Sequence, residues 1–212
     1  MRNLIVATLI ALATVAPALA AERNPQTAAL TPADREVVAQ VEQTLNGIKT
    51  MKSHFLQVSS NGAQAEGELY ISRPGKLRIN YAPPTPMQLL VEGSYLIQVD
   101  TKLGTLTYIP LSRTPAGILI RSDIKLDGDI TVTGIRRGQG VVRVGMVQRG
   151  KEDEGELTMV FTESPFALRQ WSVMDAQGVE TQVTLMNPEV NVALDPHVFD
   201  FDARKYDSNR ME

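Results

Sequence analysis

Two histidines are the side chains of this sequence best suited to acid–base or metal chemistry. His54 lies in an apolar stretch, and His197 follows a proline near the C-terminal end. Neither has a second metal ligand two or four positions after it, and no G-x-S-x-G turn offers a nucleophile for a catalytic triad. A structural role therefore suits both histidines better than catalysis.

A run of charged residues at 151–156 (Lys-Glu-Asp-Glu-Gly-Glu) is the other feature that could bind an ion. Its carboxylates lack the spacing of an EF-hand calcium loop, so a solvated hairpin tip is the better interpretation. The chain contains no cysteine, which excludes disulfides, thiolate-bound zinc, iron–sulfur clusters and a lipid anchor on cysteine. We therefore expect no enzyme activity, no metal and no cofactor.

The N-terminal 20 residues have the three parts of a secretory signal peptide. Met1-Arg2-Asn3 is a short positive region, residues 4–16 are apolar, and Ala18-Leu19-Ala20 is a small-x-small cleavage site. Residues 21–30 show no periodicity and are predicted to be a flexible lead. Residues 31–212 then form a single domain, in which no apolar run approaches the roughly 18 residues of a membrane span. These features predict a soluble protein exported to the periplasm.

One amphipathic helix is predicted at the start of this domain. Thr31 is a suitable N-cap, Pro32 fits the first helical position, and Asp34 completes a capping box. Apolar residues then recur at helical spacing and predict a helix of about 16–18 residues. The apolar stripe comprises Val37, Val38, Val41, Leu45 and Ile48.

The rest of the domain has the alternating pattern of β-strands separated by Gly, Pro, Asn and Ser. Short turns of this kind predict sequential antiparallel pairing. Residues 110–124 interrupt the pattern, and Thr114-Pro115 can cap a short helix there. A short extended tail is expected near 191–201. The predicted strands are 54–60, 64–73, 76–81, 87–92, 95–100, 105–110, 130–137, 141–149, 156–162, 167–175 and 179–187.

This order of elements predicts a mainly β fold of the α+β class. Its centre is a strongly curved antiparallel sheet, an incomplete barrel of about eleven strands, in which Gly67 and Gly145 are expected to introduce bends. The few helical residues cannot cover so wide an apolar face, so part of it is expected to line a cavity. Methionines suit such a lining because they adapt to irregular partners, although they also serve as ordinary core filling. They lie at positions 87, 146, 159, 174 and 186.

Residues 67–81 (Gly-Glu-Leu-Tyr-Ile-Ser-Arg-Pro-Gly-Lys-Leu-Arg-Ile-Asn-Tyr) resemble the LolA family of periplasmic outer-membrane lipoprotein carriers. That family shares the pattern G-x-L-x-x-x-R-P-G-x-(F/L)-R-x-x-Y. Residues 108–119 look like its lid helix, residues 165–178 are similar to its later strands, and residues 198–201 resemble its final short strand. The resemblance covers most of residues 31–202.

The resemblance implies an open half-barrel with a helical lid over an apolar cavity that accepts acyl chains. It also implies that Arg73, in the R-P-G turn, hydrogen-bonds the lid and helps to hold it shut, the alternative being that Arg73 only orders the turn. The family often has aromatic residues where this chain has Leu77, Ile79 and Ile97, so a more aliphatic cavity is expected. The residues expected to contact lipid are Leu69, Ile71, Leu77, Ile79, Leu89, Val91, Ile118, Leu119, Met146, Met159, Phe161, Trp171 and Val173.

The partners implied by the resemblance are acylated lipoproteins as cargo and an inner-membrane ATP-driven transporter that releases them. Delivery would be to an outer-membrane receptor or to the outer membrane directly. We expect a monomer, and the acidic balance (net charge −3) argues against nucleic-acid binding. A periplasmic lipid- or lipoprotein-binding sensor of the same fold is the alternative. A hydrolase or sugar-binding β-protein fits less well, because a nucleophile context is missing and Trp171 is the single tryptophan.

Overall fold

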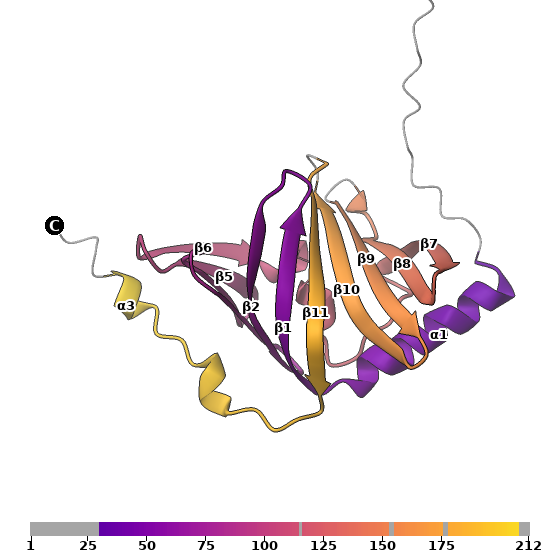
Figure 1. Cartoon of the computed structure of the whole chain (residues 1–212), viewed down its shortest axis with the longest axis horizontal. Helices are drawn as coiled ribbons and strands as arrows, with labels where there is room; N and C mark the ends of the chain where they lie inside the picture. The colour runs from indigo at the N-terminus through magenta and orange to yellow at the C-terminus, as the bar shows by residue number, and fades with distance from the viewer. Residues whose placement is uncertain (1–29, 115, 153–154, 176–177, 208–212) are drawn as a thin grey trace, which may run out of the picture.

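A strongly curved antiparallel sheet of eleven strands forms the body of the protein (Figure 1). The computed structural model describes residues 30–114, 116–152, 155–175 and 178–207. The predicted signal peptide and nearly all of the predicted lead lie outside the described residues. The strands are β1 (Thr50–Ser59), β2 (Gln64–Ser72), β3 (Lys76–Tyr81), β4 (Met87–Glu92), β5 (Tyr95–Asp100), β6 (Thr105–Pro110), β7 (Ile130–Gly138), β8 (Val141–Gln148), β9 (Gly155–Glu163), β10 (Phe166–Asp175) and β11 (Glu180–Val190).

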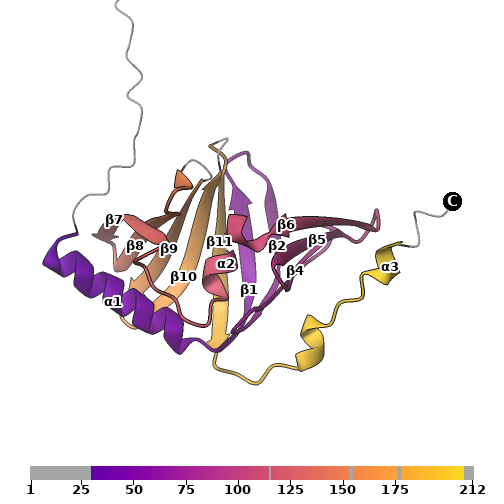
Figure 2. The same ribbon diagram turned by 180° about the vertical axis from the view of Figure 1, so that it is seen from behind.

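The strand order explains why one connection must cross the concave side of the sheet. The order is β6-β5-β4-β3-β2-β1-β11-β10-β9-β8-β7, so β1 and β11 pair in the middle and every other neighbour is sequential. Strands β6 and β7 are consecutive in the chain but form the two opposite edges. Residues 111–129 therefore span from one edge to the other, and Figure 2 shows their short helix α2 (Ala116–Leu119) in front of the concavity.

The predicted fold class is confirmed, and several elements match the predicted limits. Strands β3, β4, β5 and β6 begin and end at the predicted residues. The first strand begins at Thr50, four residues before the prediction, because it follows helix α1 (Pro32–Gly47) almost directly. The capping box is present, since the Thr31 side chain accepts from the Asp34 N–H while the Asp34 carboxylate accepts from the Thr31 N–H.

One hydrophobic core fills the concave side of the sheet. It combines the inward residues of the strands with the apolar stripe of α1 and the apolar residues of the crossing connection. Helix α1 contributes Val37, Val41 and Leu45, and it packs against β10. Figure 2 shows α1 running along the β7–β10 half of the sheet.

A second, smaller cluster lies on the convex side and corrects one prediction. Leu90, Ile97 and Val99 are buried there beneath Phe201 and Tyr206 of the C-terminal segment. Ile97 therefore does not face the cavity side, because β5 carries apolar residues on both faces and its inward residue is Leu96.

The predicted final strand at 198–201 is also wrong, because the chain turns into a 3-10 helix (Pro196–Phe199). The cause is local. The Asp195 side chain accepts from the His197 N–H, and Pro196 occupies the first helical position.

Three ladders contain a register shift, at Lys52/His54, Val132/Gly134 and Leu168/Gln170, and such bulges bend the strands that carry them. Gly67 has a different role from the predicted bend. A Cβ atom at this position would lie 2.1 Å from the Asn80 carbonyl oxygen on β3, so the two strands approach too closely for a side chain.

Replacement of Gly67 by alanine is expected to lower the free energy of unfolding by about 1–3 kcal/mol, because the two strands must separate. Urea denaturation followed by circular dichroism would measure this loss. The matched control is Gly134→Ala, because a Cβ at Gly134 has no neighbour within 4 Å. An equal effect of the two substitutions would show that the close approach has no energetic importance.

Candidate functional site

The crossing connection forms a lid whose apolar side chains fill much of the concavity. It begins with the 3-10 helix η1 (Leu111–Arg113), continues through α2, and reaches β7 through residues 120–129. Gly117 lets α2 pack closely on η1, because a Cβ there would lie 2.6 Å from the Leu111 carbonyl oxygen. The buried apolar side chains of the lid are Ile118, Leu119, Ile120, Ile124 and Leu126.

Arg73 connects the lid to the end of helix α1. Its Nε donates to the Arg121 carbonyl oxygen at 2.7 Å, just after α2. Its Nη1 donates to the carbonyl oxygens of Leu45 and Ile48, the latter at 3.1 Å, and its Nη2 donates to Asn46 Oδ1 at 3.1 Å. One guanidinium therefore links the β2–β3 turn, which carries it, to the end of α1 and to the lid.

The charge of Arg73 suits its position at the end of a helix. The last carbonyl groups of a helix have no partner within the helix and carry partial negative charge, which a cation stabilises. Partial burial lowers the pKa of Arg73 and the Asp123 carboxylate acts in the opposite direction, but an arginine stays protonated at neutral pH. The neighbouring Gly75 adds a backbone bond from its N–H to the Ile120 carbonyl oxygen at 2.9 Å.

Other bonds fasten the remaining parts of the lid. At its start, the Leu111 N–H donates to the Ser94 carbonyl oxygen at 2.8 Å, and Lys151 Nζ donates to the Ser112 carbonyl oxygen at 3.1 Å. After α2, Arg121 forms an ion pair with Asp129 at 2.7 Å. The hydrogen bond from Arg121 holds the pKa of the Asp129 carboxyl below its usual value.

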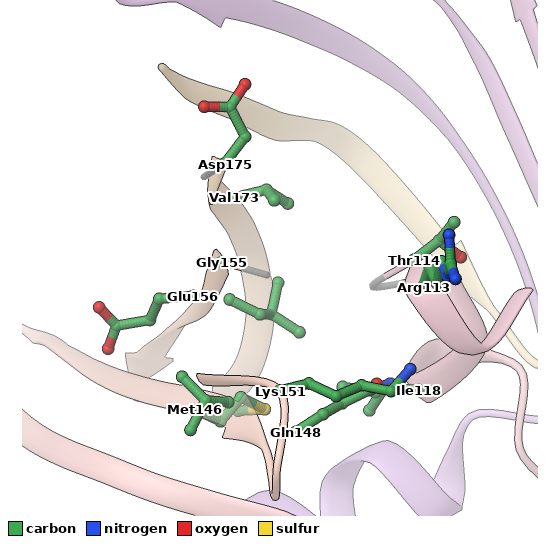
Figure 3. Close-up of a pocket in the computed structure, with 12 residues that line it drawn as sticks. Arg113, Thr114, Ile118, Met146, Gln148, Lys151, Gly155, Glu156, Val173 and Asp175 are labelled. Atoms are coloured by element: carbon green, nitrogen blue, oxygen red, sulfur yellow. The ribbon is translucent and has the colours of Figure 1, made fainter. Parts of the chain in front are cut away.

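A small cavity of about 190 Å³ remains between the lid and strands β8 to β10 (Figure 3). Figure 3 shows Arg113 and Thr114 of the lid on one side and Val173 and Asp175 of β10 on the other. The wall combines apolar groups with a charged rim. The apolar lining residues are Ile118, Met146, Val147, Leu157 and Val173, and the charged ones are Arg113, Lys151, Glu156 and Asp175.

The structure brings all of the predicted lipid-contacting residues into the single inner core cluster. Most are buried, and Ile79, Leu89, Val91 and Val173 are partly buried against it. Ile118, Met146 and Val173 line the remaining cavity, whereas the others pack against the lid, α1 or one another. Because side chains of the crossing connection pack on the inner face, these residues form a core rather than an open surface.

Some residues of the site were not predicted, and others were predicted wrongly. Leu157 of β9 lines the cavity, and its place in an alternating strand was a signal that could have identified it. Of the methionines suggested as lining, Met174 and Met186 are exposed, at 39% and 48%. Each shares a strand face with polar neighbours, so their chemical type alone was misleading.

The histidines lie away from this site. His54 is exposed on β1, and His197 is exposed beside Asp200, whose oxygen lies 2.8 Å from its Nδ1 and raises its pKa. Among the described residues, no group of three or more His, Asp or Glu side chains could hold a metal. Within the same part of the chain, no helix is long and apolar enough to cross a membrane.

Comparison with known proteins identifies relatives along most of the chain. The family model of the outer membrane lipoprotein carrier protein LolA matches residues 46–202. An outer-membrane lipoprotein carrier protein from Chromobacterium violaceum is 27% identical over 180 residues, which cover 80% of this chain and 85% of the relative. Another, from Methylococcus capsulatus, is 24% identical over 172 residues, covering 77% and 82%.

Solved structures with a similar fold are more distant in sequence. A LolA superfamily protein from Nitrosomonas europaea superimposes with a TM-score of 0.43 at 9% identity, covering 77% of this chain and 97% of that one. A putative outer membrane lipoprotein-sorting protein domain from Vibrio parahaemolyticus gives a TM-score of 0.49 at 11% identity, with coverages of 77% and 95%.

Proposed function

Because this chain belongs to the LolA family of outer membrane lipoprotein carrier proteins, we propose that it shields the acyl chains of lipoproteins released from the inner membrane and delivers them to the outer membrane. The observation that carries this proposal is the apolar inner face of the half-barrel, covered by a lid that a few hydrogen bonds hold closed. The lipid-contacting residues would be those of this inner face.

The small volume of the closed cavity supports a lid that opens. Pockets for small molecules usually measure about 300–1,000 Å³, and the cavity beneath the lid, at about 190 Å³, is smaller than that. Room for a long acyl chain on the inner face would therefore come from movement of the lid residues. Each methylene withdrawn from water is worth roughly 0.8 kcal/mol, so burial of a long acyl chain on the inner face, in place of the lid residues, is worth about 10 kcal/mol.

The proposed transport needs no catalytic step in this protein. Cargo uptake requires energy, because lipoproteins are stable in the bilayer, and we infer an ATP-driven transporter in the inner membrane as its source. Release would go to an outer-membrane receptor or to the membrane itself. The free energy of the closed, empty state favours that release, because closing the lid buries its apolar side chains again.

A charge in the cavity is expected to prevent uptake. Val173 is partly buried in the cavity wall, so a glutamate there can reach water when the site is empty but would meet hydrocarbon when it is loaded. Burial of an unpaired carboxylate costs several kcal/mol, and we expect Val173→Glu to release at least about ten-fold less labelled lipoprotein from spheroplasts.

The control for this experiment is Leu103→Glu, which adds the same charge at a leucine that is 63% exposed on the β5–β6 turn. It should release as much lipoprotein as the wild type. No release by the wild type would refute the carrier function, and normal release by Val173→Glu would show that acyl chains bypass this cavity.

A further inference from the structure

The bonds between the lid and the rest of the protein fall into two groups. Residues 111–114 and 116–121, here called the gate, bond Arg73 and Gly75 of the β2–β3 turn, and also Ser94 and Lys151. Residues 124–126, here called the anchor, bond helix α1 instead. Ser122 and Asp123 lie between these two parts and are exposed.

Asn46 of α1 binds the anchor in the way that a neighbouring strand would. Its Nδ2 donates to the Ile124 carbonyl oxygen at 2.9 Å, and its Oδ1 accepts from the Ile124 N–H at 2.8 Å. One side-chain amide therefore satisfies both backbone groups of a buried residue, since Ile124 is only 1% exposed. An unpaired buried backbone group is costly, so this pairing favours one position of the segment.

Glu42 makes the second contact with the anchor. Its Oε1 accepts from the Leu126 N–H at 2.6 Å. Residues 42 and 46 are one helical turn apart and share a face of α1, so the two side chains hold alternate residues of the anchor. Ile124 and Leu126 also insert buried side chains into the inner core. Movement of the gate does not require these contacts to break.

We propose that Glu42 and Asn46 keep residues 124–126 docked on α1 while the gate swings away, with Ser122 and Asp123 as the hinge. This inference rests on the proposed carrier function and assigns its moving part. Asn46 Oδ1 also accepts from Arg73 Nη2 at 3.1 Å, so one side chain contacts both the anchor and the residue that bonds the gate. A docked anchor returns the gate to the same closed position after each delivery.

Amide hydrogen exchange on the empty protein tests the anchor without any cargo. The N–H groups of Ile124 and Leu126 report on the anchor, and the Gly75 N–H reports on the gate because it donates to Ile120. In Asn46→Ala, the Ile124 N–H should exchange at least about ten-fold faster than in the wild type, because it loses its acceptor. The Gly75 N–H should change less, because Arg73 loses one of its four bonds and keeps the bond to the gate.

Two further variants separate the specific bonds from general destabilisation of α1. Asn46→Asp keeps an acceptor for the Ile124 N–H and for Arg73, and should retain most of the protection at Ile124. Gln43→Ala removes an exposed side chain on the same helix and should change none of these amides. Unchanged exchange of Ile124 in Asn46→Ala would overturn the anchor.

The same measurement on loaded protein tests the gate, with a synthetic tripalmitoylated cysteinyl peptide as the probe. In the wild type, the Gly75 N–H should lose at least about ten-fold in protection while Ile124 and Leu126 stay protected. Equal loss at all three amides would overturn the inference and show that the lid lifts as one piece. If the wild type takes up no probe, the carrier proposal and the gate are both overturned. The anchor is then still tested by hydrogen exchange on the empty protein.

Discussion

Replacement of Arg73 by leucine is expected to leave lipoprotein uptake intact and to stop delivery. Arg73 joins the lid residue Arg121 to the end of α1, and its bond to the Arg121 carbonyl oxygen requires the closed lid. Loss of this bond destabilises the closed, empty state but not the loaded one. The carrier would therefore hold its cargo more tightly and release it less readily.

The size of the effect follows from the number and type of the bonds. A hydrogen bond from a charged donor contributes roughly 1.5–3 kcal/mol, and Arg73 donates one to the lid, at the Arg121 carbonyl oxygen. Its loss would shift the equilibrium about ten- to a hundred-fold towards the loaded protein. Arg73→Lys should restore delivery only in part, because an ammonium group cannot reproduce the planar fork of a guanidinium.

Transfer of a labelled lipoprotein from the loaded carrier to outer-membrane vesicles would measure delivery. Arg78→Leu is the matched control, because Arg78 lies in the same hairpin but bonds Asn80, Gln88 and the Asp200 carbonyl oxygen on the convex side. It should deliver at the wild-type rate. Normal delivery by Arg73→Leu would reduce Arg73 to a residue that orders the turn.

Much of the fold could be predicted from the sequence, because the alternation of apolar and polar residues in most strands has one physical cause, the burial of a single face. Strand β3 alternates Leu77 and Ile79 inward with Arg78 and Asn80 outward, and its turns contain Gly or Pro, so its limits and its faces were both predictable. The alternation fails where both faces of a strand are covered. In β5, Ile97 is as apolar as Leu96 because the C-terminal segment covers it, and no local pattern distinguishes inside from outside.

The closed state of the site could not be predicted in the same way. The lid residues Ile120, Ile124 and Leu126 follow no periodicity, so the sequence did not indicate that they fill the concavity. The contacts of Asn46 depend on residues 78 positions away, and an amide in a helix has no feature that predicts such a partner. Recognition of Arg73 depended on the family pattern, since an arginine in a turn is by itself unremarkable.

Replacement of Leu77 by glutamate is expected to unfold the protein rather than only to block lipid binding. Leu77 is 3% exposed and lies in the inner core beside Ile71, its cross-strand neighbour. Removing a buried leucine costs about 2–5 kcal/mol, and an unpaired buried carboxylate costs several kcal/mol more. Since domains are stable by only about 5–15 kcal/mol, most of this variant should be unfolded at neutral pH.

Urea denaturation across a range of pH would separate the two parts of this loss. Burial raises the pKa of a carboxyl group, so the folded variant binds more protons than the unfolded chain between the two pKa values. Its stability should therefore rise as the pH falls through the raised folded-state pKa, and the gain should be complete below the unfolded value of about 4.3. Leu77→Met, which keeps the volume without a charge, should lose less than about 1.5 kcal/mol at every pH. A folded, pH-independent Leu77→Glu protein would mean that this position faces water in an open cavity, and that the closed lid is not the resting state of the carrier.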